Sequence, residues 1–416
     1  MISHGNELTR KSAAAPVPRK LGPESSSERL VRYRHALSGS PAPLAWVDLD
    51  LLESNVDAML ARAGGKRLRV GTKSIRSRSV LELILARLPS YAGLMTMNAR
   101  ETLWLAKLGL RDLVIGYPTV NAKELSDLAT AVAGGADLTL MADLAEHLDR
   151  YEAVARAHGI QFKVCLDLDA STWVPGIYFG VHRSSLSNAK RVEELMNAGK
   201  WPNVKIEGLM AYEAQVAGVQ DSPPARWQAP VIAWLKSRSV AQIRRRRAEA
   251  VEVLKSSGAS LRFVNGGGTG SLGSTSKDPI VDEITVGSGF FSPALFDHYS
   301  DFKFEPAAGF ALEITRHSHA GTWTCLGGGY PASGVGPDRA PIPYLPTGIK
   351  LLQNEGAGEV QTPISSRDEL SIGDLVFFRH AKAGELCERF NELHLIRGDR
   401  VVDIVRTYRG EGQCIL

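Results

Sequence analysis

The 416-residue sequence has few cysteines and lacks long apolar segments. Its four cysteines stand far apart, at Cys165, Cys325, Cys387 and Cys414. Isolated cysteines in a long chain are typical of reduced thiols in a cytoplasmic protein rather than of a disulfide framework. No apolar segment follows the N-terminus, and no run of about eighteen apolar residues occurs. The sequence therefore predicts a cytoplasmic protein with no signal peptide and no membrane span.

A strong charge asymmetry is also missing. The net charge is +4 and the pI is about 8.8, but lysine and arginine are spread along the chain. The one dense basic run, Arg244 to Arg247, lies among apolar residues at helical spacing, so it predicts the solvated face of a helix. No aromatic residues interleave with this run, and no Walker-type phosphate loop occurs. We therefore expect no nucleic-acid partner.

Three regions differ in the spacing of their apolar residues. Residues 1–40 are rich in Ser, Pro, Ala and basic residues and predict a flexible extension. In residues 41–300, short apolar runs alternate with amphipathic segments, which indicates parallel strands covered by helices on both faces. The predicted helices span residues 51–62, 100–108, 122–133, 144–158, 185–198 and 241–255. Eight such units close a (β/α)8 barrel. Nine apolar runs occur, and we place the first, LAWVDLD at residues 44–50, outside the barrel.

Residues 301–416 have a different pattern. The segments FALEITRHS, TWTCLG, ELSIGDLVFFR, ELHLIRG and RVVDIVRTYRG are typical of strands joined by Gly, Pro and Asp turns. No long amphipathic helix stands between them. The predicted fold class is α/β, a (β/α)8 TIM-like barrel followed by a C-terminal all-β domain.

A single lysine, Lys73, ends the apolar part of LRVGTKSIRS, residues 68–77. An α/β barrel places its chemistry at such strand ends. A lysine there acts as an amine nucleophile when burial or nearby cations disfavour its charged form. Arg76 and Arg78 are candidates for such cations, or for binding a substrate carboxylate. For this motif taken alone, a surface lysine in a loop is the alternative.

Two glycine-rich turns follow the last predicted barrel strands. They are VNGGGTGS at residues 264–271 and VGSG at residues 286–289. Consecutive glycines allow backbone N–H groups to converge on an anion, and the hydroxyls of Thr269 and Ser271 add donors. A merely tight loop is the alternative. A phosphate-binding turn together with a strand-end lysine indicates pyridoxal phosphate, which is held by its phosphate and by a lysine Schiff base.

In this order, these motifs make the chain resemble the fold-type III pyridoxal-phosphate enzymes, the group of alanine racemase. Within that group it is most similar to the D-threonine aldolase and D-serine dehydratase branch. The matching segments are PLAWVDLDLLESNV, RVGTKS, VNGGGTGS, VGSG and FFRHAKAGELCERFNEL. The resemblance covers residues 41–416 and implies a homodimer in which Lys73 is the Schiff-base lysine. It also implies that five residues lie near the cofactor phosphate, namely Gly267, Gly268, Thr269, Gly287 and Ser288.

His380 and Cys387, in the segment RHAKAGELC, are candidate metal ligands because imidazole and thiolate both bind zinc. In the aldolase and dehydratase branch, a histidine followed closely by a cysteine or aspartate binds a divalent metal. Here six residues separate His380 from Cys387, so the spacing departs from that pattern. We expect a divalent metal, zinc, manganese or magnesium, on these two side chains. A loop histidine and a half-buried thiol are the alternative.

Other candidate residues end predicted barrel strands. Tyr212 and Gln215 end the GLMAYEAQ run and face the predicted catalytic rim. Related aldolases have a histidine near this position that assists deprotonation of the β-hydroxyl, whereas this chain has Gln215. Tyr178 or Trp173 is the candidate for contacting the pyridine nitrogen of the cofactor, where related enzymes often have an arginine. Asp167 and Asp169 end the FKVCLDLD run and have either a positioning role or a structural one.

The predicted function is a pyridoxal-phosphate-dependent, metal-assisted lyase acting on D-β-hydroxy-α-amino acids. It would act by retro-aldol cleavage or by dehydration, on a small amino-acid substrate. An amino-acid racemase, which needs two opposed acid/base groups and no metal, is one alternative. A non-catalytic pyridoxal-phosphate-binding protein is the other.

Overall fold

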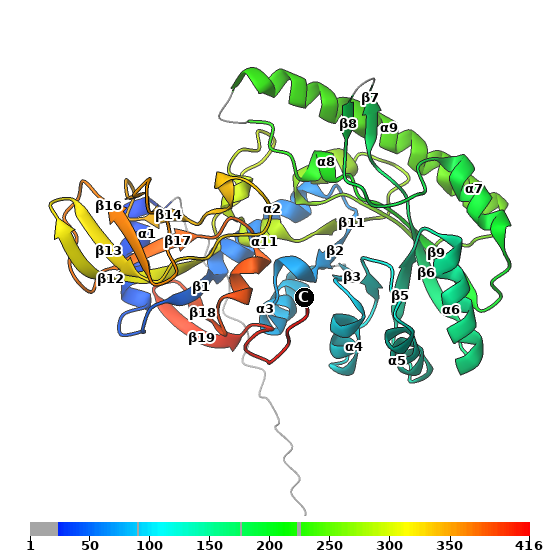
Figure 1. The fold of residues 1–416 in the computed structure, drawn as a ribbon, viewed down its shortest axis with the longest axis horizontal. Coiled ribbons are helices and arrows are strands. Elements are labelled where there is room, and N and C mark those ends of the chain that lie inside the picture. Colours follow the sequence, from blue (N-terminus) through cyan, green and yellow to red (C-terminus); the bar gives the residue numbers. More distant parts are fainter. Residues whose placement is uncertain (1–23, 90, 175–176, 223–225) are drawn as a thin grey trace, which may run out of the picture.

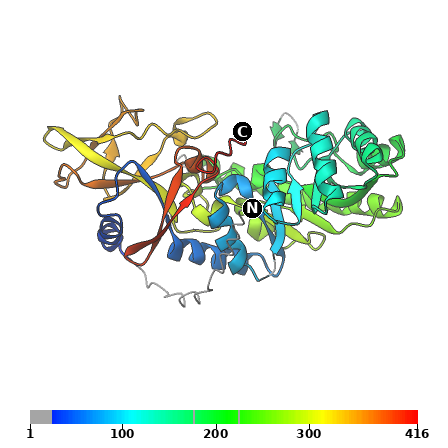
Figure 2. The ribbon, with the colours of Figure 1, turned by 90° about the horizontal axis from the view of Figure 1, so that it is seen from below.

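The computed structural model describes residues 24–89, 91–174, 177–222 and 226–416. Figure 1 shows a barrel wrapped by helices beside a domain of strands. Figure 2, turned by 90° about the horizontal axis, shows the same two parts next to each other along the length of the molecule. Among the described residues, no helix combines the length and the apolar character that crossing a membrane requires.

Eight parallel strands close the barrel in the order β10, β11, β2, β3, β4, β5, β6 and β9. They are β2 (Arg67–Gly71), β3 (Tyr91–Thr96), β4 (Leu113–Ile115), β5 (Leu138–Ala142), β6 (Phe162–Asp167), β9 (Val204–Ala211), β10 (Phe263–Gly266) and β11 (Glu283–Val286). Most of their side chains are buried, because helices cover the outer face of the barrel and side chains fill its interior. The prediction of a (β/α)8 barrel is confirmed.

Each of the six predicted helix ranges overlaps a helix around the barrel, although some of the end residues differ. The helices around the barrel are α2 (Leu49–Arg62), α3 (Arg78–Arg87), α4 (Ala99–Lys107), α5 (Ala122–Ala133), α6 (Ala145–His158), α7 (Ala189–Ala198) and α9 (Ala229–Ser256). Helix α3 was not predicted, and α9 begins at Ala229 rather than at residue 241. In Figure 1, α9 arches over the barrel next to the small hairpin of β7 (Thr172–Val174) and β8 (Ile177–Phe179).

The second domain is a nine-stranded sheet with the main order β15, β16, β13, β12, β1, β18, β19. Its strands are β1 (Leu44–Asp48), β12 (Ala308–His319), β13 (Thr322–Leu326), β14 (Ile342–Leu345), β15 (Lys350–Leu351), β16 (Gln361–Ser365), β17 (Leu375–Arg379), β18 (Glu392–Arg397) and β19 (Arg400–Arg406). Strand β1 pairs with β12 and β18, so its placement outside the barrel is confirmed. The region predicted as the barrel, residues 41–300, therefore begins with a strand of the other domain.

The predicted flexible extension, residues 1–40, is wrong for its second half, and its first 23 residues lie outside the described part. Helix α1 (Ser26–Ala36) begins with a capping box in which Ser25 and Glu28 bond each other's backbone amides. Tyr33 is fully buried, with its ring 4.8 Å and 5.4 Å from aromatic rings of β1 and β17. The apolar partners of α1 lie on distant strands, so local composition did not reveal them.

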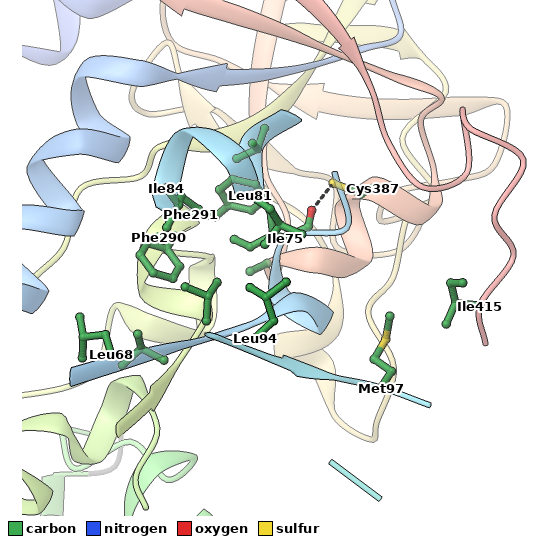
Figure 3. Packing of buried hydrophobic residues seen from close by; sticks show 14 of the residues in the cluster. Leu68, Ile75, Leu81, Ile84, Leu94, Met97, Phe290, Phe291, Cys387 and Ile415 are labelled. Carbon is green, nitrogen blue, oxygen red and sulfur yellow. Dashed lines mark hydrogen bonds between the residues drawn. The ribbon is translucent and has the colours of Figure 1, made fainter. Parts of the chain in front are cut away.

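The two domains meet beside Lys73. The link from β17 to β18 contains a short 3₁₀ segment, η6 (Gly384–Glu388). A Cβ atom on Gly384 would lie 1.9 Å from the carbonyl oxygen of Lys73, so only glycine permits this approach. Nearby, the thiol of Cys387 donates a hydrogen bond to the carbonyl oxygen of Ile75 at 3.1 Å (Figure 3). The C-terminal domain is thereby fixed against the turn that carries the lysine.

The basic run in α9 is not a solvated face, so that prediction is wrong. Arg245 is exposed, but Arg247 is only 1% exposed. Its guanidinium contacts the carboxylates of Glu213 at 2.5 Å and Asp278 at 3.1 Å. These carboxylates come from the ends of distant barrel units, which helical periodicity cannot reveal. Arg247 therefore belongs to the core between α9 and the mouth of the barrel.

We expect Arg247→Met to lower the free energy of unfolding by about 3–5 kcal/mol, because it leaves two buried carboxylates without their cation. Arg245→Met, on the same helix, is the matched control and should stay within about 0.5 kcal/mol of the wild type. Urea denaturation measures both. Equal losses in the two variants would contradict this assignment.

Candidate functional site

Lys73 lies at the C-terminal end of β2, in the short 3₁₀ segment η1 (Thr72–Ser74), and its side chain is exposed. Strands β2 and β11 are neighbours in the barrel, so the turn after β11 lies beside this segment. The hydroxyls of Ser74 and Ser288 are 3.2 Å apart and form a hydrogen bond. The second glycine-rich turn and the lysine turn thus meet at one edge of the barrel mouth, the end at which barrel enzymes bind their ligands.

The two glycine-rich turns are joined through Thr269. Its hydroxyl accepts hydrogen bonds from the amides of Gly287 at 3.4 Å and Gly289 at 3.1 Å. A Cβ on Gly287 would lie 2.6 Å from the hydroxyl of Ser74, and one on Gly268 would lie 3.1 Å from the ring of Tyr212. The absence of a side chain at both positions leaves space between the two turns, which we call the cradle.

A buried carboxylate, that of Glu213, holds the first glycine-rich turn in place. Glu213 accepts a hydrogen bond from the amide of Gly267 at 3.1 Å and another from the hydroxyl of Thr275. Arg247 pairs with the same carboxylate. Gly267 has φ +76°, a conformation that favours glycine. The backbone of the turn is therefore anchored to the barrel through Glu213.

Gly268, Gly270 and Gly273 also have the spacing of a dinucleotide-binding turn. That turn requires a full helix whose first residues face the pyrophosphate, in an open sheet. Here the glycines lead into α10 (Leu272–Thr275), which has four residues, inside a closed barrel. The structure does not support a dinucleotide site.

Arg183 faces the mouth from the other side and was not recognised in the sequence. Its guanidinium bonds Asp167 at 2.6 Å and the carbonyl oxygen of Gly116 at 2.7 Å. It also stacks 4.7 Å from the ring of Tyr117 and lies 5.9 Å from that of Tyr212. Arg183 stands in an irregular loop with no motif around it, so only the fold identifies it. Its position makes it a donor for an anionic or electron-rich ligand.

Two side chains near Arg183 have shifted pKa values. Burial raises the pKa of Asp167 to about 6, although the neighbouring Arg183 opposes the shift. Burial also raises the pKa of Tyr212, and the carboxylate of Glu213 adds to that effect. At neutral pH the Tyr212 hydroxyl keeps its proton and remains a hydrogen-bond donor.

Tyr178, Trp173 and Gln215 lie on the same side of the barrel, in or beside the hairpin of β7 and β8. The hydroxyl of Tyr178 is 2.7 Å from that of Ser171, and Trp173 is 61% exposed. The amide of Gln215 donates to the carbonyl oxygen of Ala170 at 2.5 Å. These contacts hold the loop after β6. Roles for Tyr178 and Gln215 toward cofactor or substrate stay predictions.

Arg76 and Arg78 are committed to other partners. Arg76 is buried and pairs with Glu388 at 2.7 Å, while its Nε donates to the carbonyl oxygen of Lys73 at 3.1 Å. Arg78 pairs with Glu82 at 3.2 Å. Arg76 therefore joins the lysine turn to the C-terminal domain instead of meeting a substrate carboxylate.

The pair His380 and Cys387 does not fit a metal in this arrangement. The thiol of Cys387 is fully buried and donates to Ile75, and burial raises its pKa to about 12. A thiolate ligand is therefore disfavoured. Nδ1 of His380 is bonded to the backbone of Lys382, at 2.7 Å from its oxygen and 3.1 Å from its nitrogen. Among the described residues, no group of three or more metal-ligand side chains occurs.

The surroundings of the His380 ring differ from those of the Cys387 thiol. Its imidazole is 2% exposed, and its Nε2 has no hydrogen-bond partner among the described residues. Burial lowers the pKa of His380, so the ring is neutral at neutral pH. Its carbonyl oxygen accepts from the amide of Ala294, in the loop after the second glycine-rich turn. The segment that begins at His380 thus packs on that loop and, at Gly384, on the lysine turn.

Pyridoxal phosphate fits the mouth of this barrel. In the described part of the chain, the amides of Thr269 and Ser288 bond no acceptor, so both are available to a phosphate. The hydroxyls of Thr269 and Ser288 belong to the same two turns. Lys73, which is exposed, directly precedes Ser74 in the sequence. The predicted phosphate residues are thus brought together beside the predicted lysine.

The sequence matches a known family over more than half of its length. A family model described as alanine racemase, N-terminal domain, matches residues 47–274. A 3-hydroxy-D-aspartate aldolase of Paracoccus denitrificans is 26% identical over 262 residues, which are 62% of this chain and 62% of that enzyme. The match therefore spans less than two thirds of the relative's length.

Solved structures share the fold of nearly the whole chain. D-threonine aldolase from Filomicrobium marinum has a TM-score of 0.75 and 19% identity, over 90% of this chain and 96% of that one. D-threo-3-hydroxyaspartate dehydratase from Delftia sp. HT23 has a TM-score of 0.72 and 18% identity, over 89% and 98%. Solved forms of that dehydratase include a cysteine-to-alanine variant in the metal-free form, and a histidine-to-alanine variant two positions earlier.

We expect Gly287→Ala to raise the dissociation constant of pyridoxal phosphate by about tenfold or more, because the added methyl displaces Ser74 in the cradle. Gly71→Ala is the matched control, since its Cβ would meet only ordinary contacts of 3.5 Å or longer. Absorbance titration with the cofactor measures both constants. Unchanged binding in Gly287→Ala would place the phosphate elsewhere.

Proposed function

Because the chain belongs to the alanine racemase N-terminal domain family, whose members are fold-type III pyridoxal-phosphate enzymes, we propose that it is a lyase acting on D-β-hydroxy-α-amino acids. The observation that carries this proposal is the convergence of Lys73 with the two glycine-rich turns at one edge of the barrel mouth. The similarity to a 3-hydroxy-D-aspartate aldolase supports carbon–carbon cleavage of a 3-hydroxyaspartate-type substrate.

The residues of the mouth divide the work of binding between them. When bound, the cofactor supplies an electron sink for the bond that breaks at Cα. Lys73 holds its aldehyde end, and the amides and hydroxyls of Thr269 and Ser288 hold its phosphate. Arg183, oriented by Asp167, offers donors on the opposite side of the mouth. These residues would hold the cofactor from both sides of the mouth.

Cleavage between Cα and Cβ requires a group that takes the proton of the β-hydroxyl. Gln215 cannot do so, because an amide is not a base and its NH₂ group is bonded to Ala170. We assign this role to His380, whose Nε2 is unpartnered among the described residues and whose loop packs on the Lys73 turn. The C-terminal domain would then supply the base that the barrel lacks.

Metal assistance does not extend from the relatives to the predicted ligand pair. In the solved variants of D-threo-3-hydroxyaspartate dehydratase, the altered histidine and cysteine are two positions apart, and the cysteine variant was solved in the metal-free form. In this chain, the residue two positions after His380 is Lys382, and Cys387 is a buried thiol bonded to Ile75. The proposed cleavage therefore uses no metal at His380 and Cys387.

Dehydration is the second candidate, because the dehydratase has the same fold. It needs an acid for the departing hydroxyl, and the protonated Tyr212 beside Gly268 is available. Racemisation would instead return the enantiomer of the substrate. A homodimer and a cytoplasmic location stay predictions of the sequence, and sedimentation velocity of the purified protein checks the first.

With pyridoxal phosphate and D-3-hydroxyaspartate, we expect the protein to release glycine and glyoxylate. Lys73→Ala should lose both the absorbance of the lysine-bound cofactor and all turnover, whereas Lys107→Ala, an exposed lysine of α4, should behave as the wild type. Oxaloacetate and ammonia would indicate dehydration, and the L-isomer alone would indicate racemisation. A protein that binds no cofactor would refute the proposal altogether.

We expect His380→Gln to keep the cofactor absorbance and the KM but to lower kcat by about 10²–10⁴-fold, the usual contribution of a general base. Glutamine preserves the volume and the hydrogen bond to Lys382 but cannot take a proton. Steady-state kinetics over a range of substrate concentrations separates kcat from KM. An unchanged kcat would exclude His380 as the base.

A further inference from the structure

The segment from the end of β17 to Gly384 is held by contacts at three of its residues, so its side chains cannot rearrange freely. Arg379 pairs with Asp297 at 2.7 Å, and the carbonyl oxygen of His380 accepts from the amide of Ala294 at 3.0 Å. Further along, Gly384 packs on the carbonyl oxygen of Lys73. Bringing Cys387 to His380 would break its hydrogen bond with Ile75 and disturb this packing (Figure 3). His380 therefore has to find any second ligand among the residues next to it.

The residue two positions after His380 is a cation. Lys382 lies two positions after His380, and its ammonium donates to the hydroxyl of Ser333 at 2.8 Å. It also pairs with the carboxylate of Glu385 at 3.5 Å. Glu385 in turn accepts hydrogen bonds from the amide of Ser333 at 2.7 Å and its hydroxyl at 2.6 Å. Lysine, serine and glutamate form a closed cluster beside the histidine.

The charges of this cluster already balance without a metal. Glu385 interacts electrostatically with both Lys382 and His380, so it is the carboxylate that a metal at His380 would need. It is neutralised by Lys382, and a second cation, Arg389, also acts on His380. A divalent ion placed here would meet two positive groups and one carboxylate. Coulomb repulsion and the loss of the ion pair both oppose its binding.

We infer that the ammonium group of Lys382 takes the place of a divalent cation beside His380, so that the site binds no metal. The positive charge that a metal would present to a substrate hydroxyl or carboxylate is then supplied by the protein itself. This catalytic meaning rests on the proposed lyase function, whereas the absence of a metal site does not. One substitution at position 382 should accordingly restore a divalent ion.

The test measures metal binding by calorimetry, with Mn²⁺ and Zn²⁺ as probes on protein loaded with pyridoxal phosphate. We expect no binding by the wild type, and no loss of its activity after treatment with EDTA. Lys382→Cys and Lys382→Asp should each gain one ion per chain, with an affinity at least about 100-fold above that of the wild type. Both gains should disappear when His380→Ala is added.

Two controls keep this result specific. Lys382→Ala removes the cation without adding a ligand and should gain no ion. Lys350→Cys places a thiol on an exposed strand of the same domain and reports nonspecific binding. One tightly bound ion per chain in the wild type, or activity lost with EDTA and restored by metal, would overturn the inference. So would failure of both folded Lys382 variants to gain an ion. If the wild type binds no ion but shows no lyase activity, the proposed function fails and the inference about the metal stands.

Discussion

The contact between Gly384 and the carbonyl oxygen of Lys73 is the constraint on which the rest of this site depends. The two residues are more than three hundred positions apart in sequence, and any side chain at position 384 would separate them. Cys387 and Glu388 strengthen the same contact through the backbone of Ile75 and the guanidinium of Arg76. The second domain therefore packs on the turn that carries Lys73, through the segment that begins with His380 and Lys382.

Buried charge gives the mouth its rigidity. Glu213 and Arg247 lie below the first glycine-rich turn, and Asp167 and Arg183 lie across from it. Each pair has additional hydrogen bonds to backbone atoms, which offsets the cost of removing charges from water. Such pairs orient neighbouring groups better than they stabilise the fold. Here one pair holds the backbone of the glycine-rich turn, and the other fixes the orientation of Arg183.

The features that the sequence predicted correctly are those that short segments encode. The alternation of apolar runs with helices predicted the barrel, and the extra run before α2 predicted a strand outside it. The positions of Lys73 and of the two glycine-rich turns at strand ends were predicted because strand, turn and residue type occur together within ten residues. The capped helix α1 was missed, since a Ser-rich start and partners on β1 and β17 leave no local apolar pattern. The burial of Arg247 was missed for the same reason.

By itself, the sequence determined which residues end the barrel strands, because hydrophobic periodicity and glycine-rich turns are properties of neighbouring residues. It therefore determined that Lys73 and the two glycine-rich turns stand at strand ends. Only the tertiary structure decided which side chains from separate segments meet there. It assigned Arg183 to the mouth, directed the Cys387 thiol at Ile75 and placed Lys382 with Glu385 beside His380. The physical reason is that the contacts of Arg183 with Gly116, of Cys387 with Ile75 and of Lys382 with Ser333 join distant segments, and no spacing along the chain encodes them.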